Sequence, residues 1–336
     1  MESKTGVLLI NLGTPDSPSV SDVRSYLSQF LNDPRVIDIP WLLRKILVNL
    51  IIVPFRAPKS AAVYQKLWTK DGSPLLFHSR RAQRLLQEAL GNTFEVHLAM
   101  RYKNPSIPDV LEKMRLKNYQ RIVVLPMFPQ YASASTGSAL EEVMRIVKTW
   151  WVIPEMRVIS QYYDHADFIE AFALRGQHYN FAEYDHVLFS YHGLPERQVT
   201  KVHRTGTCDD HGCTHEVNEE NQYCYKATCY ATTRLLAKRL NIPADQYTVS
   251  FQSRLDQKWI KPFSDEVIRE CGKKGMKKLL VFSPAFTADC LETVIEIGEE
   301  YQDLFREHGG EKVQLVESLN DHPRWIACLK NLVLSA

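Results

Sequence analysis

Short apolar runs alternate with segments of helical periodicity along the whole chain. Runs such as Gly6–Leu12, Arg121–Phe128 and Lys278–Ser283 are rich in Val, Leu and Ile and are bounded by polar or turn residues, which is typical of buried strands. Between these runs, apolar residues recur at the three- and four-residue intervals of a helix face. The alternation predicts βαβ units and an α/β fold with parallel sheets.

The individual elements follow from this pattern and from the turn residues between them. Strands are expected at 6–12, 93–100, 121–128, 156–160, 186–190, 247–252, 278–283 and 312–317. Helices are expected at 22–31, 80–90, 108–116, 136–149, 164–179, 222–240, 263–273, 290–305 and 322–334. The segment Ala57–Ser79 is expected to be a polar connection.

The chain has 336 residues, which exceeds the usual size of one domain. Because the rhythm restarts near residue 150, we expect a domain over 1–150, a second over 151–320, and a last helix over 321–336 that packs on the first. A weak internal repeat agrees, since Val7–Pro15 resembles Val187–Pro195 and Val123–Val143 resembles Leu279–Ile297. Chance similarity between strand–loop–helix units is the alternative. The pattern favours two similar domains that face each other across a cleft.

One segment, Ile39–Phe55, is apolar enough to raise the question of a membrane. It is interrupted by Arg44 and Lys45 and closed by Pro54, so we expect it to be too short and too charged to span a bilayer. Two interpretations stay open: a buried helix, or an apolar lip that rests on a membrane surface or covers an apolar ligand.

Composition excludes some classes of function. The net charge is +2 and no polybasic tract is present, so nucleic acid is not an expected partner. The first residues, MESKTGVLLINLG, lack the features of an export signal, and we expect a cytoplasmic protein. Seven cysteines, an odd number, argue against a disulfide framework and for thiolate chemistry or a metal.

The segment Val187–Arg197, VLFSYHGLPER, ends an apolar run abruptly in a histidine. Gly193 and Pro195 stop the strand, which puts His192 at its carboxyl end, where open α/β sheets bind ligands. The alternative is a histidine that is simply hydrogen-bonded within a loop.

A second candidate is the acidic segment SPAFTADCLETVIEIGEE. Asp289 and Glu292 fit a capping box at the start of a helix, which is the simpler interpretation. The recurrence of carboxylates at Glu292, Glu296, Glu299 and Glu300 also aligns them on one helix face, at a small cost from like-charge repulsion. An imidazole and a carboxylate on two sides of a bound molecule can accept its protons or guide a cation to it.

Six motifs in order make the chain resemble ferrochelatase. They are LINLGTPDSP, LPMFPQYASASTGSAL, LFSYHGLPER, SFQSR, SPAFTADCLETVIEIGEE and ESLNDHP. The resemblance implies two Rossmann-like, chelatase-type domains with a porphyrin in the cleft between them. It also implies insertion of Fe²⁺ into the porphyrin to form haem. Because porphyrin and haem are apolar, we expect the apolar lip to make peripheral contact with the inner face of the cytoplasmic membrane.

The same resemblance assigns roles to residues. His192 matches the catalytic histidine and Glu292 the active-site glutamate, so Fe²⁺ is expected to meet these two. Asp289 and Glu296 resemble the acidic residues that lead toward the site. The expected cleft and porphyrin-contacting positions are Leu12, Arg56, Arg101, Tyr102, Tyr131, Ser133 and Trp259.

Two departures from the family pattern are informative. Leu12 stands where coproporphyrin-using relatives usually carry a tyrosine, so we favour protoporphyrin IX as the substrate. Cys290 stands where many relatives have histidine. It is either a soft metal contact or a small buried residue.

Four cysteines, Cys208, Cys213, Cys224 and Cys229, are separated by four, ten and four residues. The last two are expected in the first turns of a helix, where the dipole favours thiolate. Zinc sites usually have closer pairs, whereas iron–sulfur clusters tolerate C-x₄-C spacing. Since some ferrochelatases carry such a cluster, we predict [2Fe–2S] with zinc as the alternative, and with His211 and His215 as substitute ligands. The centre would stabilise a polar loop.

A coproporphyrin ferrochelatase is the alternative for the substrate, and two other functions stay open. The first is a chelatase for cobalt or nickel and a different tetrapyrrole, which the SYHGLPER and CLETVIEI motifs disfavour. The second is a non-catalytic tetrapyrrole-binding iron–sulfur protein, which the presence of both His192 and Glu292 disfavours.

Overall fold

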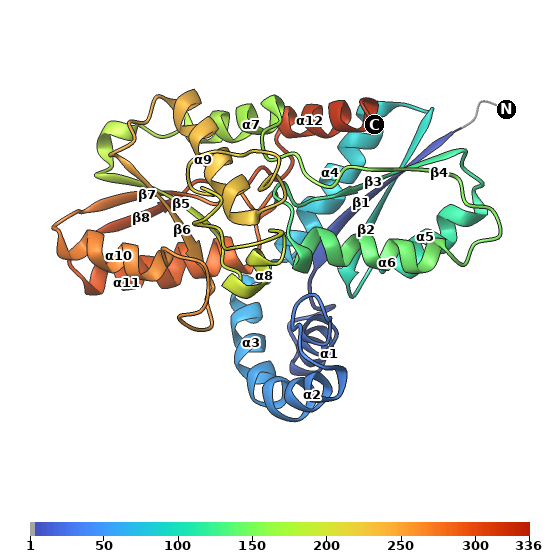
Figure 1. Cartoon of the computed structure of the whole chain (residues 1–336), viewed down its shortest axis with the longest axis horizontal. Helices are drawn as coiled ribbons and strands as arrows, with labels where there is room; N and C mark the ends of the chain where they lie inside the picture. Colours follow the sequence, from blue (N-terminus) through green and yellow to red (C-terminus); the bar gives the residue numbers. More distant parts are fainter. Residues whose placement is uncertain (1–3) are drawn as a thin grey trace. The chain divides into compact units, whose positions relative to one another are not determined.

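The computed structural model describes residues 4–336, so the first three residues of the expected first domain lie outside the described part. It contains two four-stranded parallel sheets with helices between their strands, which confirms the predicted α/β fold (Figure 1). The chain divides into two compact units. Unit 1 holds the described residues up to Phe128 together with Ser133–Ser160 and Ile326–Ala336, and unit 2 holds Pro129–Ala132 and Gln161–Trp325.

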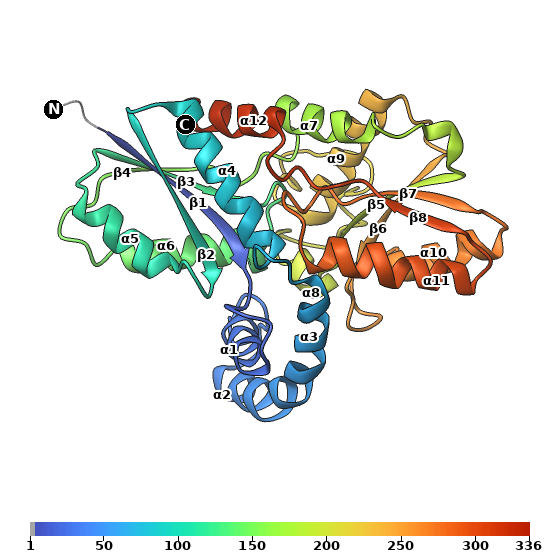
Figure 2. The ribbon, with the colours of Figure 1, turned by 180° about the vertical axis from the view of Figure 1, so that it is seen from behind.

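The sheet of unit 1 has the strand order β2-β1-β3-β4. Its strands are β1 (Thr5–Gly13), β2 (Phe94–Tyr102), β3 (Arg121–Pro126) and β4 (Glu155–Val158). The central strand β1 is buried on both faces because helices α4 (Pro74–Leu90), α5 (Ile107–Leu116) and α6 (Ser138–Val147) cover the sheet (Figure 2). A continuous apolar run is what a strand buried on both faces requires.

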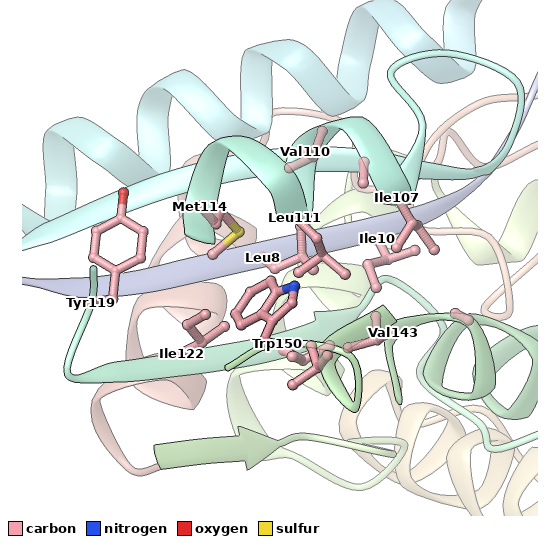
Figure 3. Close-up of a cluster of buried hydrophobic side chains, with 14 residues drawn as sticks. Leu8, Ile10, Ile107, Val110, Leu111, Met114, Tyr119, Ile122, Val143 and Trp150 are labelled. Atoms are coloured by element: carbon pink, nitrogen blue, oxygen red, sulfur yellow. The ribbon is translucent and has the colours of Figure 1, made fainter. Parts of the chain in front are cut away.

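One core of unit 1 lies between this sheet and helices α5 and α6. Leu8 and Ile10 project from the same face of β1 and meet Leu111 of α5, Val143 of α6 and the ring of Trp150 (Figure 3). Burial of these side chains supplies most of the stabilisation of this layer, at roughly 25 cal/mol per Å² of apolar surface.

Unit 1 also carries a helical projection, where the structure differs from the prediction. After α1 (Val20–Leu31), one long helix runs through α2 (Trp41–Ile46), a π-helical stretch (Leu47–Ile52) and α3 (Val53–Leu67). The segment expected to be a polar connection, Ala57–Ser79, is therefore helical over most of its length. Pro54 does not end the helix; it lies where the π-helical stretch passes into α3. The projection is visible below the sheet in Figure 1.

The long helix is amphipathic. One side packs on α1, with the rings of Tyr26 and Tyr64 in edge contact at 6.2 Å, and the buried Arg44 donates to the Ile39 carbonyl at 2.9 Å. The other side is apolar and exposed, at Trp41, Leu42, Leu43, Ile46, Leu50, Ile51 and Phe55. By length and composition alone, the longer helix Trp41–Leu67 is long and apolar enough to cross a membrane. Core helices of soluble proteins pass the same test, so the expectation that Ile39–Phe55 does not span a bilayer stays a prediction. We keep the name apolar lip for the seven exposed residues.

The sheet of unit 2 has the order β6-β5-β7-β8. Its strands are β5 (His186–His192), β6 (Tyr247–Gln252), β7 (Lys278–Phe282) and β8 (Lys312–Leu315). Helices α7 (Ala166–Gly176) and α9 (Tyr225–Leu240) lie on one face (Figure 1). The other face is covered by α10 (Ser264–Lys273), a π-helix (Glu292–Tyr301) and α11 (Gln302–Glu307). Unit 2 also contains the short helices α8 (Glu196–Thr200) and Phe181–Glu183. Most of the final helix, α12 (Pro323–Leu334), belongs to unit 1.

The internal repeat has a structural counterpart. β1 and β5 occupy the same place in their sheets, as do β3 and β7. The segment after β3 contains a short π-helix (Ser133–Gly137), and the segment after β7 contains the long one. The repeated segments therefore correspond to equivalent strand–loop–helix units.

Candidate active site

His192 is the last residue of β5, as the sequence predicts, and it pairs in register with Gln252 at the end of β6. Its Nδ1 lies 2.6 Å from the Gly193 carbonyl oxygen. A carbonyl only accepts, so Nδ1 carries the hydrogen of this bond, and Nε2 is the ring nitrogen that the bond does not engage. The bond thus fixes the orientation of the imidazole at the carboxyl edge of the sheet.

The immediate surroundings of His192 are aromatic and closely packed. The rings of Trp259 and Phe286 each lie 6.4 Å from the imidazole, centre to centre. A Cβ at Gly193 would stand 2.7 Å from the Gln252 carbonyl oxygen and 3.1 Å from the Trp259 ring. Only glycine fits here, because the next strand and the tryptophan occupy the space that a side chain would need.

Glu292 is the first residue of the π-helix and is half-buried. The neighbouring thiol of Cys290 is buried, and burial followed by the Glu292 charge raises the pKa of that thiol, which donates to the carboxylate. Cys290 therefore remains protonated, which fits the interpretation of a small buried residue. π-Helical stretches are rare and often occur at functional sites.

The capping-box interpretation does not describe this helix start. Asp289 accepts from the Asn320 side chain at 2.7 Å and from the Ser318 N–H at 3.2 Å. The Cys290 N–H is satisfied by the Thr293 hydroxyl at 3.0 Å. Asp289 thus anchors the loop before the helix to the segment after β8. The Glu292 side chain does not form the return hydrogen bond that a capping box would require.

Glu296 lies one turn beyond Glu292 and is tightly anchored. It accepts from Gln252 Nε2 at 2.9 Å, from the Ser253 N–H at 2.8 Å and hydroxyl at 2.5 Å, and from the Tyr301 hydroxyl at 3.1 Å. Four donors hold this carboxylate in one orientation. Glu299 and Glu300, farther along, are exposed, so the predicted stripe divides into two site carboxylates and two solvated ones.

Gln252 and Ser253 are the site residues that sequence reasoning missed. Gln252 is buried and donates both to the Glu292 backbone carbonyl, at 3.0 Å, and to Glu296. It therefore connects the end of β6 to the π-helix. Because Gln252 also pairs with His192 in the sheet, it connects His192 to the same helix. The SFQSR motif contained both residues, but their role depends on the pairing of β5 with β6, which the sequence alone did not reveal.

The predicted site residues of unit 1 lie in two environments. Tyr102 is fully buried and its hydroxyl donates to Asp33 at 2.9 Å, while Arg101 pairs with the same carboxylate at 2.6 Å. Burial, and then the charge of Asp33, raise the pKa of Tyr102. This network holds β2 against the segment after α1, so the structure gives Tyr102 a packing role and leaves it no surface for a porphyrin.

The remaining predicted positions are more accessible. Leu12 is half-buried near the end of β1, and Arg56 is exposed on α3. The Ser133 hydroxyl accepts from Arg35 at 2.9 Å. In unit 2, the ring of Tyr131 contacts that of Tyr223 at 5.8 Å.

A buried cluster of metal-binding side chains lies in unit 2 between α8 and α9. It consists of His203, Cys208, Cys213 and Cys224, whose donor atoms all lie within 4.8 Å of one another. We call these four residues the His/Cys cluster. Hydrogen bonds from Cys208 and Cys213 lower the pKa of Cys224.

The cluster differs from the predicted ligand set at one position. Cys229 is buried in α9 but is not a member of the cluster among the described residues; its thiol is hydrogen-bonded to Tyr225. The predicted substitute ligand His211 uses both ring nitrogens, toward the Thr205 carbonyl and Glu220. These two acceptors, the carbonyl first, raise the pKa of His211, and His215 is exposed. His203 was missed because it lies upstream of the first cysteine.

Comparisons with solved structures agree with this fold. The structure of SirB from Bacillus subtilis with Fe3+ has a TM-score of 0.52 and 13% identity, over 99% of this chain and 95% of that one. A crystal structure of the sirohydrochlorin chelatase SirB in complex with cobalt has a TM-score of 0.51 and 13% identity, over 99% of this chain and 94% of that one. The molecule is thus an α/β protein of the chelatase fold.

The sequence comparisons are more specific. The model of the ferrochelatase family matches residues 4–336. The ferrochelatase of Coxiella burnetii (strain Dugway 5J108-111) is 46% identical over 333 residues, covering 98% of this chain and 93% of that protein. The ferrochelatase of Legionella pneumophila (strain Lens) is 45% identical over 337 residues, covering 98% of each. The chain belongs to the ferrochelatase family, the enzymes that insert ferrous iron into a porphyrin in haem synthesis.

Proposed function

We propose that the chain inserts Fe²⁺ into protoporphyrin IX, with His192 as the base that accepts the pyrrole protons. The observation that carries this proposal is the bond from His192 Nδ1 to the Gly193 carbonyl, which leaves Nε2 free to take a proton. Ferrous iron and porphyrin exchange a metal ion for two N–H protons, with no electron transferred. The reaction therefore needs proton acceptors and a route for a cation, which His192 and the carboxylates supply.

Glu292 is the proposed partner of His192 for protons or iron. It lies at the start of a helix that Gln252 fastens to the strand next to His192, which supports a fixed separation between imidazole and carboxylate. A rigid site also favours catalysis, because a porphyrin bent by its binding surface exposes its nitrogen lone pairs to the entering metal. Trp259 offers an aromatic surface beside the imidazole for a flat macrocycle.

Glu296 acts as the fixed negative charge behind Glu292. Its four donors leave it no freedom to follow an ion, so its proposed part is to attract Fe²⁺ electrostatically and to hold the end of β6. Asp289 has the same anchoring character at the helix start. Fe²⁺ is a substrate here and meets His192 and Glu292 only during transfer.

Protoporphyrin IX is favoured over coproporphyrin because Leu12 offers no ligand to a metal and the apolar lip exposes a large hydrophobic surface. The test is anaerobic incubation with Fe²⁺ and either porphyrin, watching for the haem spectrum. A kcat/KM at least tenfold higher with protoporphyrin IX supports the proposal. Higher activity with coproporphyrin overturns the substrate, and turnover only with cobalt or nickel overturns the reaction.

We also propose peripheral contact between the apolar lip and the inner face of the cytoplasmic membrane. Seven exposed apolar residues on one side of a helix, opposite a side packed on α1, form the kind of surface that lies in a membrane interface. Both the porphyrin and haem are apolar, so a membrane-bound enzyme meets them where they dissolve.

The His/Cys cluster is proposed to bind a resident metal centre. The sequence predicts [2Fe–2S], with zinc as the alternative. Both centres take cysteine ligands, and the arrangement of the donor atoms discriminates between them.

A further inference from the structure

The buried interior of the segment between α8 and α9 is made almost entirely of metal-binding side chains. Over residues 203–224, the only buried residues are His203, Cys208, Cys213, Cys224 and Asn221. The remaining residues are polar, charged or half-exposed. A loop of this length without an apolar core usually needs a metal or disulfide to hold it, and all seven cysteines are free thiols.

Three spacings between the donor atoms are close to the edges of one small tetrahedron. Cys208 Sγ lies 3.6 Å from Cys224 Sγ, and His203 Nε2 lies 3.6 Å from both Cys208 Sγ and Cys213 Sγ. With Zn–S near 2.3 Å and Zn–N near 2.0 Å, a tetrahedral zinc ion gives edges of about 3.8 Å between sulfurs and about 3.5 Å between sulfur and nitrogen. The observed spacings match these edges.

A two-iron cluster requires a different spacing. Each iron of [2Fe–2S] takes only two of the four protein ligands, so the two pairs are separated by the width of the cluster, on the order of 5–6.5 Å. Here no pair of donors is more than 4.8 Å apart. The four ligands do not divide into two separated pairs, and [2Fe–2S] does not fit them.

The composition of the set agrees with a single ion. Three cysteines and one histidine form one of the usual structural zinc sites, in which all four positions belong to the protein. His203, Cys208 and Cys213 follow one another with four intervening residues each, within the range of such sites. Cys224 is at the start of α9, where the N–H groups of Lys226 and Ala227 point at its sulfur.

We propose that His203, Cys208, Cys213 and Cys224 bind one structural Zn²⁺. Binding replaces the thiol protons, which pass to solvent, and involves no change of oxidation state. Cys229 is not a ligand, because its thiol is engaged with Tyr225.

The proposed zinc site also supports His192, a consequence that rests on the proposed function. Cys224 is followed directly by Tyr225, which is buried and whose hydroxyl is hydrogen-bonded to the backbone of His192. A ligand fixed at Cys224 therefore fixes the first turn of α9 and, through Tyr225, the end of β5. Zn²⁺ holds this path in place and takes no part in iron transfer.

The first test measures metal and sulfide in the whole protein as purified, by mass spectrometry of metals, by acid-labile sulfide assay and by visible absorption. We expect one zinc per chain, no sulfide and no iron–sulfur bands. His203→Ala should lower the zinc content at least fivefold. Cys229→Ser and the matched control Cys271→Ser, a buried thiol of α10, should retain it.

Opposite results overturn the proposal. These are two irons with two sulfides per chain that are lost in Cys229→Ser and kept in His203→Ala, or a chain that binds no metal. A failure of zinc binding leaves the haem assay unaffected as a test of the proposed function, and the reverse also holds.

A second variant, His203→Cys, distinguishes the loss of a ligand from misfolding of His203→Ala. His203→Cys keeps four ligands, so it should retain one zinc per chain. On replacement by Co²⁺, we expect the intense visible bands of tetrahedral cobalt in the wild type, with added sulfur-to-metal charge transfer in His203→Cys. Identical cobalt spectra for both proteins would show that His203 is not a ligand.

Discussion

At the scale of single residues, the proposed role of each site side chain follows from its hydrogen bonds. His192 donates through Nδ1 and keeps Nε2 free, and Glu296 accepts from four donors. Glu292, by contrast, has no such set of anchors and is adjacent to the thiol of Cys290. Removal of the Glu296 carboxylate should therefore mainly lower stability, whereas removal of the Glu292 carboxylate should mainly lower activity.

Replacing each glutamate by glutamine separates these costs. Glu296→Gln turns an amide NH₂ toward the donors of Gln252, Ser253 and Tyr301, and should lower the free energy of unfolding by about 1–3 kcal/mol. Glu292→Gln should leave stability within about 0.5 kcal/mol and lower kcat at least tenfold. Chemical denaturation and steady-state haem formation measure the two effects. The reverse assignment of the losses would contradict the proposed roles.

Gly193→Ala tests the close packing beside His192. The new Cβ would meet the Gln252 carbonyl at 2.7 Å, so the strand ends must separate and His192 must move. We expect kcat to fall at least tenfold, and unfolding free energy to fall by about 1–3 kcal/mol. Gly298→Ala, where the nearest atom is 3.7 Å away, is the control and should be neutral or slightly stabilising. Wild-type activity in Gly193→Ala would refute this packing argument.

At the scale of elements, the residues that follow β6 connect the sheet to its helices. Gln252 and Ser253 hold the π-helix, while Arg254 pairs with Asp265 of α10 at 2.8 Å and lies over the Phe263 ring at 4.1 Å. One short motif, SFQSR, thereby fixes two helices to one strand end. Burial raises the pKa of Asp265, but hydrogen bonds from Arg254 and Arg269 outweigh it, so the net pKa is lowered.

The Arg254–Asp265 pair gives a prediction with a defined pH dependence. A carboxyl whose folded pKa lies below its unfolded value, near 3.8, stabilises the fold above that pH and loses the contribution as the pH falls through the folded pKa. A double-mutant cycle of Arg254→Met and Asp265→Asn should give a coupling of about 1–2 kcal/mol at pH 7 that declines below pH 3.8. A coupling that is constant with pH would exclude an ionic origin.

Most strands and helices could be predicted from the sequence, but not all of them. All eight predicted strands are present, and β6 (Tyr247–Gln252) has the predicted bounds. The central strands could be predicted because a strand buried on both faces must be apolar throughout. Helix α3 was missed because the segment after the apolar run is polar, with Lys59 and Lys66, which suggested a connection. In the structure this polar segment is helical and packs on α1, with Pro58 inside the helix. The π-helix was read as α-helix because its altered hydrogen bonding leaves no periodic signal over ten residues.

The sequence predicted the positions of His192 and Glu292 in the fold. His192 is the last residue of a strand and Glu292 is the first residue of a helix, and sequence motifs mark both. Gln252, Ser253, Asp33 and His203 act through pairings between distant segments, so only the folded chain brings them together with their partners.

At the scale of the molecule, the proposed catalytic residues and the exposed apolar surface belong to different units of the chain. Unit 2 holds the proposed base, the carboxylates and the His/Cys cluster, whereas unit 1 presents the apolar lip. The lip has no role in the proton chemistry proposed for His192. Its exposed apolar area needs a partner of its own, and a lipid surface suits both the lip and the apolar substrate.

Vesicle binding tests the lip directly. In flotation assays with anionic phospholipid vesicles, the wild type should bind, and a Trp41→Glu/Leu50→Glu variant should lose at least tenfold in affinity because two charges enter the apolar face. Leu116→Glu, on the exposed and isolated Leu116 of α5, is the matched control and should bind like the wild type. Equal binding by all three proteins would exclude the lip as the contact surface.

The central claim is that His192 is the proton acceptor in iron insertion, and His192→Ala tests it most directly. The wild type, His192→Ala and the control His186→Ala, at the other end of β5, are incubated anaerobically with Fe²⁺ and protoporphyrin IX. The account predicts haem formation by the wild type and by His186→Ala, and at least a thousandfold loss in His192→Ala, which should still bind porphyrin as judged by fluorescence. Haem formation by His192→Ala at the wild-type rate would contradict it.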